Sequence, residues 1–491
     1  MMVWLALFAS LVAFIGVLKG LAAQYHAVNA VRLAQGALAV ISDPELDDEV
    51  KERQVQRASV SLLKSFFILL AIGVAACVSA YVLVAGGNLL GLYGMQEVWQ
   101  VATSAVFLVV STVAAVLLWI LLSRRRGARG GETQENTEKR DEVPYSSMDK
   151  ALHLYAFSSS AQSTLAGLEN RLWRKRIQTT PNRRPIFVTS LPRAGTTILL
   201  ELLARQNEFA SPTYRHMPFT MAPLLWGRYS RLLRKSGAKA ERAHGDGIEV
   251  DFESPEAFEE MVWMAFWKDK YTDRNISLWE AEDRHAEFES FLDQHMRKVI
   301  IGKPGATSYV SKNNANIARL PLLKALYPES RILVPVREPL AQVQSLMRQH
   351  QRFSDLHQRD RFARQYMEGI GHFEFGAALR PIAFAGAPTS SEGAEHVDYW
   401  LRYWIAAYEH VLTQAPRDTV FVDHEALSQT PSQQLPRLAE ALAVDDQAAI
   451  SACSDMFHAS REVRTLAGAT PELISRAREV HAELLERTLK A

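Results

Sequence analysis

The chain has 491 residues, whereas a single domain usually has roughly 100–200, so at least two structural units are expected. Lysine and arginine number 55 against 54 aspartates and glutamates, which excludes a strongly basic nucleic-acid-binding chain. Hydrophobic residues make up 48% of the sequence, enough to bury a core and to exclude global disorder. The two cysteines, Cys77 and Cys453, are far apart in the sequence, which excludes a disulfide framework and a cysteine-based zinc site.

Three apolar runs occupy about residues 1–18, 66–85 and 98–122. A helix needs roughly 17–25 apolar residues to cross a bilayer, so each run is long enough to span one. The first run opens without the basic residues of a secretory signal, which favours a retained span. We therefore expect residues 1–123 to form a membrane domain with three transmembrane helices.

Basic residues are distributed unevenly around these runs. Six lysines and arginines lie between the first and second runs, none lies in 86–97, and Arg124–Arg126 directly follow the third run. Because basic loops stay on the cytoplasmic side, this pattern predicts an outer N-terminus and a cytoplasmic chain after Ser123. Residues 124–150 are polar and indicate a linker, which leaves 151–491 as a cytoplasmic domain. Three spans with such a domain suggest a bacterial inner membrane.

The stretch 184–204, RPIFVTSLPRAGTTILLELLA, predicts a buried strand, a tight turn and an apolar helix in succession. This geometry directs free backbone N–H groups and a helix N-terminus at an anion. Gly195 allows a close approach, Thr196 and Thr197 can donate hydroxyls, and Arg193 adds a forked cation. The stretch therefore predicts a phosphate-binding turn. It differs from the GxxxxGK[ST] loop because Thr196 stands in place of the lysine, which counts against a small-molecule kinase.

A second segment, 331–349, reads RILVPVREPLAQVQSLMRQ. It predicts a buried strand over 332–336, with Arg337 at the carboxyl end of the strand and Pro339 as the first helical residue. Ser345 follows nearly two helical turns later. Ligands of open α/β sheets bind at the carboxyl ends of strands, so Arg337 and Ser345 are expected to reach one phosphate together.

SLPRAGTT and VREPLAQVQS resemble the two signature segments of sulfotransferases that use 3′-phosphoadenosine 5′-phosphosulfate. The departures are Ser190 for glycine and Ala194 for serine. The resemblance covers about 184–442 and is closer to the bacterial and Golgi-type branch than to the cytosolic one. It implies an α/β fold, a P-loop-like parallel sheet flanked by helices, here preceded by the transmembrane helices.

In this resemblance, the first segment binds the 5′-phosphosulfate and the second binds the 3′-phosphate. The implied cosubstrate-binding residues are Arg193, Ala194, Gly195, Thr196, Thr197, Arg337 and Ser345. Lys312, in Ser311-Lys312-Asn313, resembles the family's lysine and would stabilise charge on the leaving nucleotide. No metal is required, and the histidines and acids show no metal-ligand spacing.

The acceptor needs a general base, which is Glu or His in this family. His216, shortly after the first signature helix, and Glu256, in DFESPEAFEE, are the candidates. Glu256 also stands where a helix would begin, and the choice between the two stays open. The aromatic residues around Trp263 and Trp400 can line an acceptor groove or form the core.

The sequence thus predicts sulfuryl transfer to a hydroxyl or amine. The membrane anchor suggests a membrane-associated lipid or glycan as the acceptor. The cytoplasmic orientation agrees with this prediction, because the sulfuryl donor is made in the cytosol. The alternatives are a P-loop-type small-molecule kinase and a membrane scaffold that binds a nucleotide without turnover.

Overall fold

The computed structural model describes residues 2–27, 29–30, 48–104, 107, 110–111, 114–115, 157–233, 240–241, 249–250, 254–458 and 465–489. The chain divides into two compact units, Met1–Arg140 and Asp141–Ala491. The predicted linker, 124–150, lies outside the described residues.

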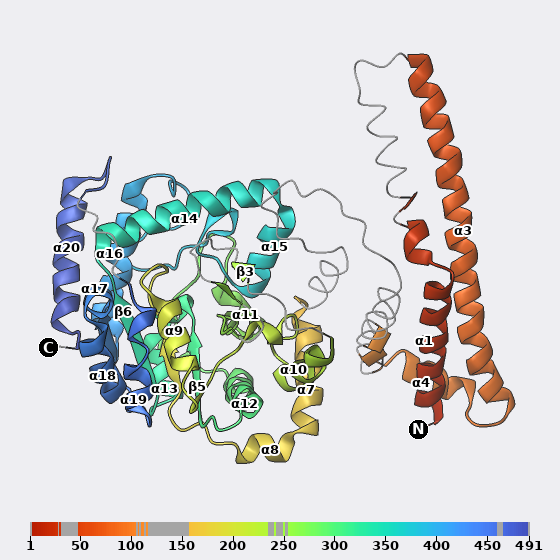
Figure 1. Ribbon diagram of the computed structural model, residues 1–491, viewed down its shortest axis with the longest axis horizontal. Helices are drawn as coiled ribbons and strands as arrows, with labels where there is room; N and C mark the ends of the chain where they lie inside the picture. Colours follow the sequence, from red (N-terminus) through yellow and green to blue (C-terminus); the bar gives the residue numbers. More distant parts are fainter. Residues whose placement is uncertain are drawn as a thin grey trace. The chain divides into compact units, whose positions relative to one another are not determined.

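The first unit contains two long apolar helices packed against each other (Figure 1). Its helices are α1 (Met2–Gly20), α3 (Asp48–Leu89) and α4 (Met95–Ala102). Val3 and Leu7 of α1 pack against Tyr93 and Val98, which follow α3. The N-terminus therefore lies at the same end of this helix pair as the turn after α3.

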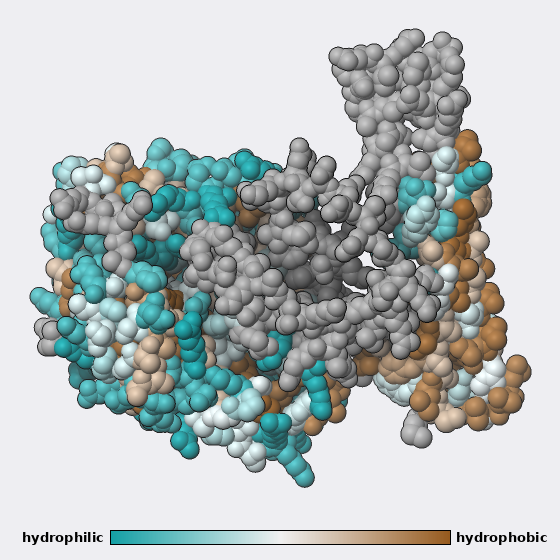
Figure 2. Space-filling model, viewed as in Figure 1, coloured by the Kyte–Doolittle hydropathy of each residue, from teal (hydrophilic) through white to brown (hydrophobic). Residues whose placement is uncertain are grey.

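Two helices in the described residues are long and apolar enough to cross a membrane, Met2–Gly20 and Val60–Leu89. At 1.5 Å per residue, α1 is about 28 Å long, close to the ~30 Å hydrocarbon core of a bilayer. The side chains along both helices leave an apolar surface, which is brown over α3 in Figure 2. In the predicted third span, α4 ends at Ala102 and most of the following residues lie outside the described part of the chain.

The second unit contains a five-stranded parallel sheet with the order β2-β5-β1-β6-β7. The strands are β1 (Ile186–Val188), β2 (Phe209–Ala210), β5 (Ser308–Lys312), β6 (Arg331–Val336) and β7 (Val420–Asp423). A separate antiparallel pair is formed by β3 (Ala240–Glu241) and β4 (Glu249–Val250).

Alternating residues of the strands enter two different cores. Phe187 of β1 and Val334 of β6 face one core, whereas Val188 and Leu333 face the other. Side chains alternate between the two faces of a strand, so fully apolar strands indicate a sheet covered on both sides. The strands are buried throughout except at a few ends, and the unit is a three-layer α/β/α structure.

Helices cover both faces of this sheet (Figure 1). One core includes side chains from α11 (Glu260–Phe266), α12 (Ala286–Gly302), α13 (Leu320–Leu326), α14 (Pro339–Arg359), α16 (Val397–Gln414) and α20 (Pro471–Glu486). The other includes side chains from α9 (Thr196–Ala204), α17 (His424–Gln429), α18 (Pro431–Ala441) and α19 (Gln447–Ser451).

The remaining helices lie around these layers. They are α7 (Ser159–Leu172), α8 (Arg174–Thr179), α10 (Pro223–Leu233), α15 (Arg361–Ile370) and the 3-10 turns η1 (Tyr214–His216), η2 (Lys268–Lys270), η3 (Asn314–Ala318), η4 (Gly376–Ala378) and η5 (Ser454–Met456).

The chain leaves β1 towards β2 on one side of the sheet and leaves β6 towards β7 on the other. β1 and β6 are neighbours with parallel register. Connections that run in opposite directions leave a crevice between the carboxyl ends of two such strands. The fold therefore brings the residues that follow β1 and β6 to one crevice.

Candidate active site

The turn between β1 and α9 has the backbone conformation of an anion-binding loop. Arg193 and Gly195 both have positive φ, at 70° and 94°. The first turn of α9 begins at Thr196 directly after Gly195, so its N–H groups have no carbonyl partners within the helix. These N–H groups lie at the positive end of the helix dipole, so an anion next to the N-terminus of α9 would be stabilised.

Side chains of the two signature segments are hydrogen-bonded to each other. Arg337 Nη1 donates to the carbonyl oxygen of Arg193 at 2.7 Å. Arg193 Nε donates to Ser345 Oγ at 3.0 Å. The structure thus brings Arg193, Arg337 and Ser345 into one cluster at the carboxyl ends of β1 and β6.

A buried glutamine of α14, which was not predicted from the sequence, also holds the turn in place. Gln342 Nε2 donates to the carbonyl oxygens of Leu191, at 3.2 Å, and Pro192, at 3.0 Å. Gln342 Oε1 accepts from Trp404 Nε1 at 2.8 Å and from the Tyr408 hydroxyl at 3.2 Å. A fully satisfied buried network of this kind holds one conformation.

The serine that departs from the family pattern has a structural partner. Ser190 Oγ donates to the carbonyl oxygen of Pro335 at 2.9 Å and lies 2.7 Å from the Tyr408 hydroxyl. Ser190 therefore links the loop after β1 to β6 and α16, a contact that glycine could not make.

Two further residues reach the cluster from the end of β7. His424 lies against Gly195, where an added Cβ would come within 2.7 Å of His424 Nδ1. Burial, with a smaller effect of the nearby Arg337, lowers the pKa of His424 to about 4. Burial also raises the pKa of Glu425 to about 7, although its Oε2 accepts a 3.2 Å hydrogen bond from the Glu338 N–H.

Arg337 retains an unused donor. Its Nε is buried and has no hydrogen-bond partner within the described residues. Burial lowers the pKa of this guanidinium, and the nearby Glu425 carboxylate partly opposes that effect. A buried donor without a partner is costly, so an anion at this position would be stabilised.

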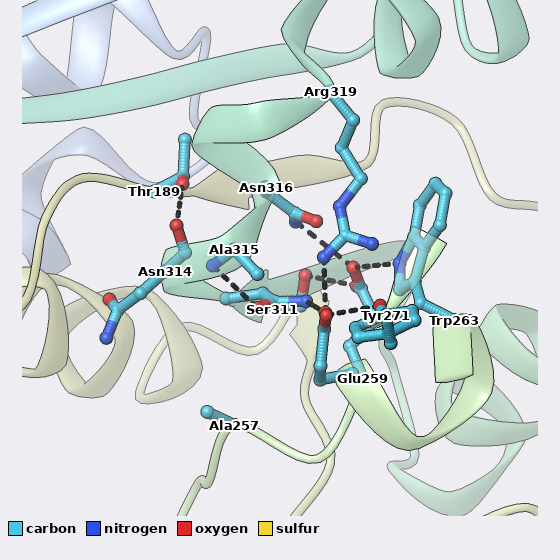
Figure 3. A network of polar contacts seen from close by, with 12 residues as sticks. Thr189, Ala257, Glu259, Trp263, Tyr271, Ser311, Asn314, Ala315, Asn316 and Arg319 are labelled. Atoms are coloured by element: carbon cyan, nitrogen blue, oxygen red, sulfur yellow. Dashed lines mark hydrogen bonds and ion pairs between the residues drawn. The ribbon is translucent and has the colours of Figure 1, made fainter. Parts of the chain in front are cut away.

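The end of β5 is held by two buried carboxylates (Figure 3). Glu259 accepts hydrogen bonds from Ser311 Oγ at 2.5 Å, Asn316 Nδ2 at 3.1 Å and Trp263 Nε1 at 3.2 Å. Side chains alternate along a strand, so Lys312 follows Val310 on the face that α9 covers. Lys312 is buried there, at the carboxyl end of β5.

Glu260 forms the second half of this network. It accepts from Asn313 Nδ2 at 2.7 Å and from the Tyr271 hydroxyl at 2.5 Å, and it pairs with the buried Arg319. The Arg319 guanidinium also lies 3.9 Å from the ring centre of Trp263. Both carboxylates are therefore used to hold the end of β5.

A narrow cavity of about 30 Å³ adjoins the turn. Its lining includes Leu191 and Pro192 of the turn, together with Asn314, Glu374 and Trp400. Asn314 joins the two regions, because its Oδ1 lies 3.4 Å from Thr196 Oγ1 and its Nδ2 donates to Glu374 Oε1 at 2.9 Å. Neither Asn314 nor Glu374 was singled out in the sequence as a functional residue.

Part of the chain matches a known protein family. Residues 185–377 match the model of the sulfotransferase family. The matched segment contains every predicted cosubstrate-binding residue, together with Lys312, Glu256 and His216. It ends before β7 and does not include the first unit. Among curated proteins, none matches the sequence.

Solved sulfotransferases have weak similarity to the chain. Sulfotransferase STF9 from Mycobacterium avium is 15% identical, with a TM-score of 0.38, over 68% of this chain and 83% of that one. Sulfotransferase STF1 from Mycobacterium tuberculosis H37Rv is 14% identical, with a TM-score of 0.38, over 67% of this chain and 84% of that one. A sulfotransferase from Alicyclobacillus acidocaldarius is 15% identical, with a TM-score of 0.30, over 62% of this chain and 97% of that one.

Within the segment that matches the sulfotransferase family, the two candidate bases have structural partners. His216 is buried, and its Nδ1 accepts the Thr213 N–H at 3.0 Å. Burial lowers the pKa of His216 to about 3. Glu256 is also buried and accepts from the Tyr214 hydroxyl and, at 2.8 Å, from the Ala257 N–H. Glu256 does not begin a helix, because α11 starts at Glu260.

Of the seven cosubstrate-binding residues predicted from the sequence, Arg193, Ala194 and Gly195 lie in the β1–α9 turn and Thr196 and Thr197 begin α9. Arg337 lies between β6 and α14, and Ser345 lies in the second turn of α14. Lys312 lies on β5, the neighbour of β1, at the same edge of the sheet. The described residues contain no group of three or more histidine, cysteine or acidic side chains that could hold a metal ion.

Proposed function

We propose that this chain transfers a sulfuryl group from 3′-phosphoadenosine 5′-phosphosulfate to a hydroxyl or amine of an acceptor. The observation that carries the proposal is the hydrogen-bonded chain from Arg337 to Arg193 and from Arg193 to Ser345. It unites the two signature segments in one cationic site. The match of residues 185–377 to the sulfotransferase family supports the same reaction.

The residues fit the two ends of this cosubstrate. Ala194, Gly195, Thr196 and Thr197 supply backbone N–H groups and hydroxyls for the 5′-phosphosulfate, with Arg193 beside them. Arg337 and Ser345 would hold the 3′-phosphate. The buried Nε of Arg337, which has no partner within the described residues, supports this assignment because a phosphate oxygen would satisfy it.

Lys312 would stabilise the negative charge that develops on the leaving phosphate. It lies at the carboxyl end of β5, which pairs with β1 so that Lys312 is opposite Val188. Cations and N–H donors directed at developing charge lower the barrier without rearranging during the reaction. The acceptor hydroxyl must also lose its proton. His216 is poorly suited to accept it, because its Nδ1 already accepts a hydrogen bond and its pKa is low.

The cellular arrangement belongs to the same proposal. Two apolar helices precede the site in sequence, and the distribution of basic residues favours a cytoplasmic location for everything after residue 123. We propose a multi-pass inner-membrane protein of bacterial type. Its acceptor would then be a membrane-associated lipid or glycan.

One assay separates this function from the two alternatives. The full chain in detergent micelles is incubated with ³⁵S-labelled donor and an extract of membrane lipids and glycans, and in parallel with γ-³²P-labelled ATP and Mg²⁺. Transfer of ³⁵S supports the proposal. Transfer of ³²P alone would support a kinase. Tight binding of adenosine 3′,5′-bisphosphate with no transfer would support a nucleotide-binding scaffold.

A further inference from the structure

The cavity beside the β1–α9 turn is lined mostly by carbon. Its apolar lining residues are Leu191, Pro192, Ile276, Ala315, Leu346, Phe373, Leu379, Ile382, Trp400 and Tyr403. The polar side chains in the lining come from Asn314, Glu374 and Arg380. Such a surface binds an apolar group and positions it with a few polar contacts.

The polar atoms of the two large ring side chains in the lining, Trp400 and Tyr403, already have partners. Trp400 Nε1 donates to the carbonyl oxygen of Ala394 at 2.8 Å, and the Tyr403 hydroxyl accepts the Ile382 N–H at 3.1 Å. These two side chains therefore present mainly their rings to the cavity. A sugar would need partners for many hydroxyl groups, and the polar side chains of this lining are limited to those of Asn314, Glu374 and Arg380.

Glu374 is the acidic residue of the lining. Its Oε1 accepts from Asn314 Nδ2 at 2.9 Å, and its Oε2 has no hydrogen bond within the described residues. Asn314 Oδ1 also lies 3.4 Å from the hydroxyl of Thr196, the first residue of α9. Glu374 is thus two hydrogen bonds away from the turn that would hold the sulfuryl group.

The backbone around Glu374 is fixed on both sides. The neighbouring side chains of Phe373 and Phe375 are buried. In the turn that follows, the N–H of Gly376 donates to His350 Nδ1 and the N–H of Ala377 donates to His357 Nδ1, both at 3.1 Å. The histidines belong to α14, the helix that also carries Ser345. A carboxylate held in this way has the defined position that proton transfer requires.

We propose that this cavity binds the hydroxyl-bearing end of an apolar alcohol or phenol, and that Glu374 is the catalytic base for it. The inference rests on the proposed function and narrows its acceptor from a lipid or glycan to an apolar alcohol. The cavity, about 30 Å³, has room for the hydroxyl-bearing end of such a molecule and is too small for a sugar ring.

Sulfuryl transfer to the alcohol needs no reactant besides the cosubstrate. Glu374 Oε2 takes the proton of the hydroxyl while the hydroxyl oxygen forms a bond to the sulfur of the phosphosulfate. The bond between sulfur and the bridging phosphate oxygen breaks, and its electron pair leaves with adenosine 3′,5′-bisphosphate. The products are a sulfate ester, that nucleotide and a proton, which Glu374 later releases to solvent.

The test uses the full chain in detergent micelles with ³⁵S-labelled donor. The probes are 1-dodecanol, farnesol and 2-naphthol as apolar alcohols, and maltose and N-acetylglucosamine as sugars. Affinity for adenosine 3′,5′-bisphosphate is measured in parallel by calorimetry. We expect saturable labelling of at least one apolar alcohol and none of either sugar. Nucleotide binding with label on the sugars only, or on no probe, overturns this inference and leaves the proposed function intact. No nucleotide binding overturns the proposed function itself.

Two variants test the residues separately. Glu374→Gln should lower kcat for the labelled alcohol at least 100-fold and leave nucleotide affinity unchanged, with Glu374→Asp restoring part of the rate. Ala315→Phe, which narrows the cavity, should raise KM for the alcohol at least 10-fold. Glu287→Gln, an exposed change on α12, is the matched control. A larger loss of kcat in Glu256→Gln than in Glu374→Gln would overturn the assignment of the base.

Discussion

The guanidinium of Arg337 donates to the backbone carbonyl of Arg193 at 2.7 Å, so the residue after β6 holds the conformation of the loop after β1. Arg193 has a positive φ of 70°, which a non-glycine residue adopts at a cost. The hydrogen bond from Arg337 and the two from Gln342 on the preceding carbonyls offset this cost. The two signature segments therefore form one structural unit.

Arg337→Ala should weaken binding of adenosine 3′,5′-bisphosphate much more than binding of adenosine 5′-phosphate. A hydrogen bond to a charged group contributes about 1.5–3 kcal/mol, so the loss should be roughly 10- to 150-fold. Calorimetry with both nucleotides measures the difference. Arg359→Ala, an exposed change at the end of α14, is the control. Equal losses for the two nucleotides would remove Arg337 from the 3′-phosphate site.

Lys312→Ala should lower turnover and leave nucleotide affinity nearly unchanged. Donors directed at developing charge contribute roughly 100- to 1,000-fold to kcat. Stopped-time ³⁵S transfer assays give kcat, and calorimetry gives the affinity. Lys268→Ala on the surface controls for the loss of one positive charge. An unchanged kcat in the Lys312 variant would show that this lysine has no part in the chemistry.

Gly195→Ala should destabilise the second unit for two reasons. Its φ of 94° disfavours any residue with a Cβ by roughly 1–2 kcal/mol, and the added Cβ would meet His424 Nδ1 at 2.7 Å. Gly305→Ala separates the two effects, because Gly305 has a φ of 85° and no atom within 4 Å of the added Cβ. Thermal unfolding in detergent micelles should show a larger fall in midpoint for Gly195→Ala. Equal falls would mean that the contact with His424 has no energetic consequence.

Glu425 should couple nucleotide binding to pH. Burial raises its pKa to about 7, which favours the protonated carboxyl in the folded chain. The contribution of Glu425 to folding stability is therefore complete below its ordinary pKa of 4.5 and is lost as pH rises through about 7. A phosphate bound at the nearby Arg337 would raise the pKa of Glu425 further, so binding should take up protons near pH 7.

Calorimetry in buffers of different ionisation enthalpy measures this proton uptake. Glu425→Gln should reduce the uptake and flatten the fall in affinity between about pH 6 and 8. Glu329→Gln, an exposed change, should behave like the unmodified chain. Identical proton uptake in the Glu425 variant and the unmodified chain would place the titrating group elsewhere.

The elements that carry the cosubstrate site could be predicted from local sequence. The apolar runs before Thr189 and Arg337 are strands, and Pro339 begins a helix, as expected. These signals are local, because they depend on β-branched runs and on residues that start helices. The tandem Thr196-Thr197 after a glycine likewise marks the start of α9.

The rest of the site depends on contacts between distant segments. Gln342 reaches Leu191 and Pro192 across about 150 residues of sequence, and Glu374 reaches Asn314 across 60. The short strands β2 and β5 lack a strong alternating pattern, and only their neighbours in the sheet identify them. The role of Glu259, three residues after the candidate base Glu256, likewise depends on distant segments, because it is a buried acceptor for Ser311 and Asn316.

The most direct measurement is an experimental structure of the full chain with adenosine 3′,5′-bisphosphate bound. We expect the 3′-phosphate against Arg337 and Ser345, the 5′-phosphate at the N–H groups of residues 194–197, and Lys312 beside the 5′-phosphate. A nucleotide bound away from the carboxyl ends of β1 and β6, or held with its 3′-phosphate out of reach of Arg337, would contradict the proposed function.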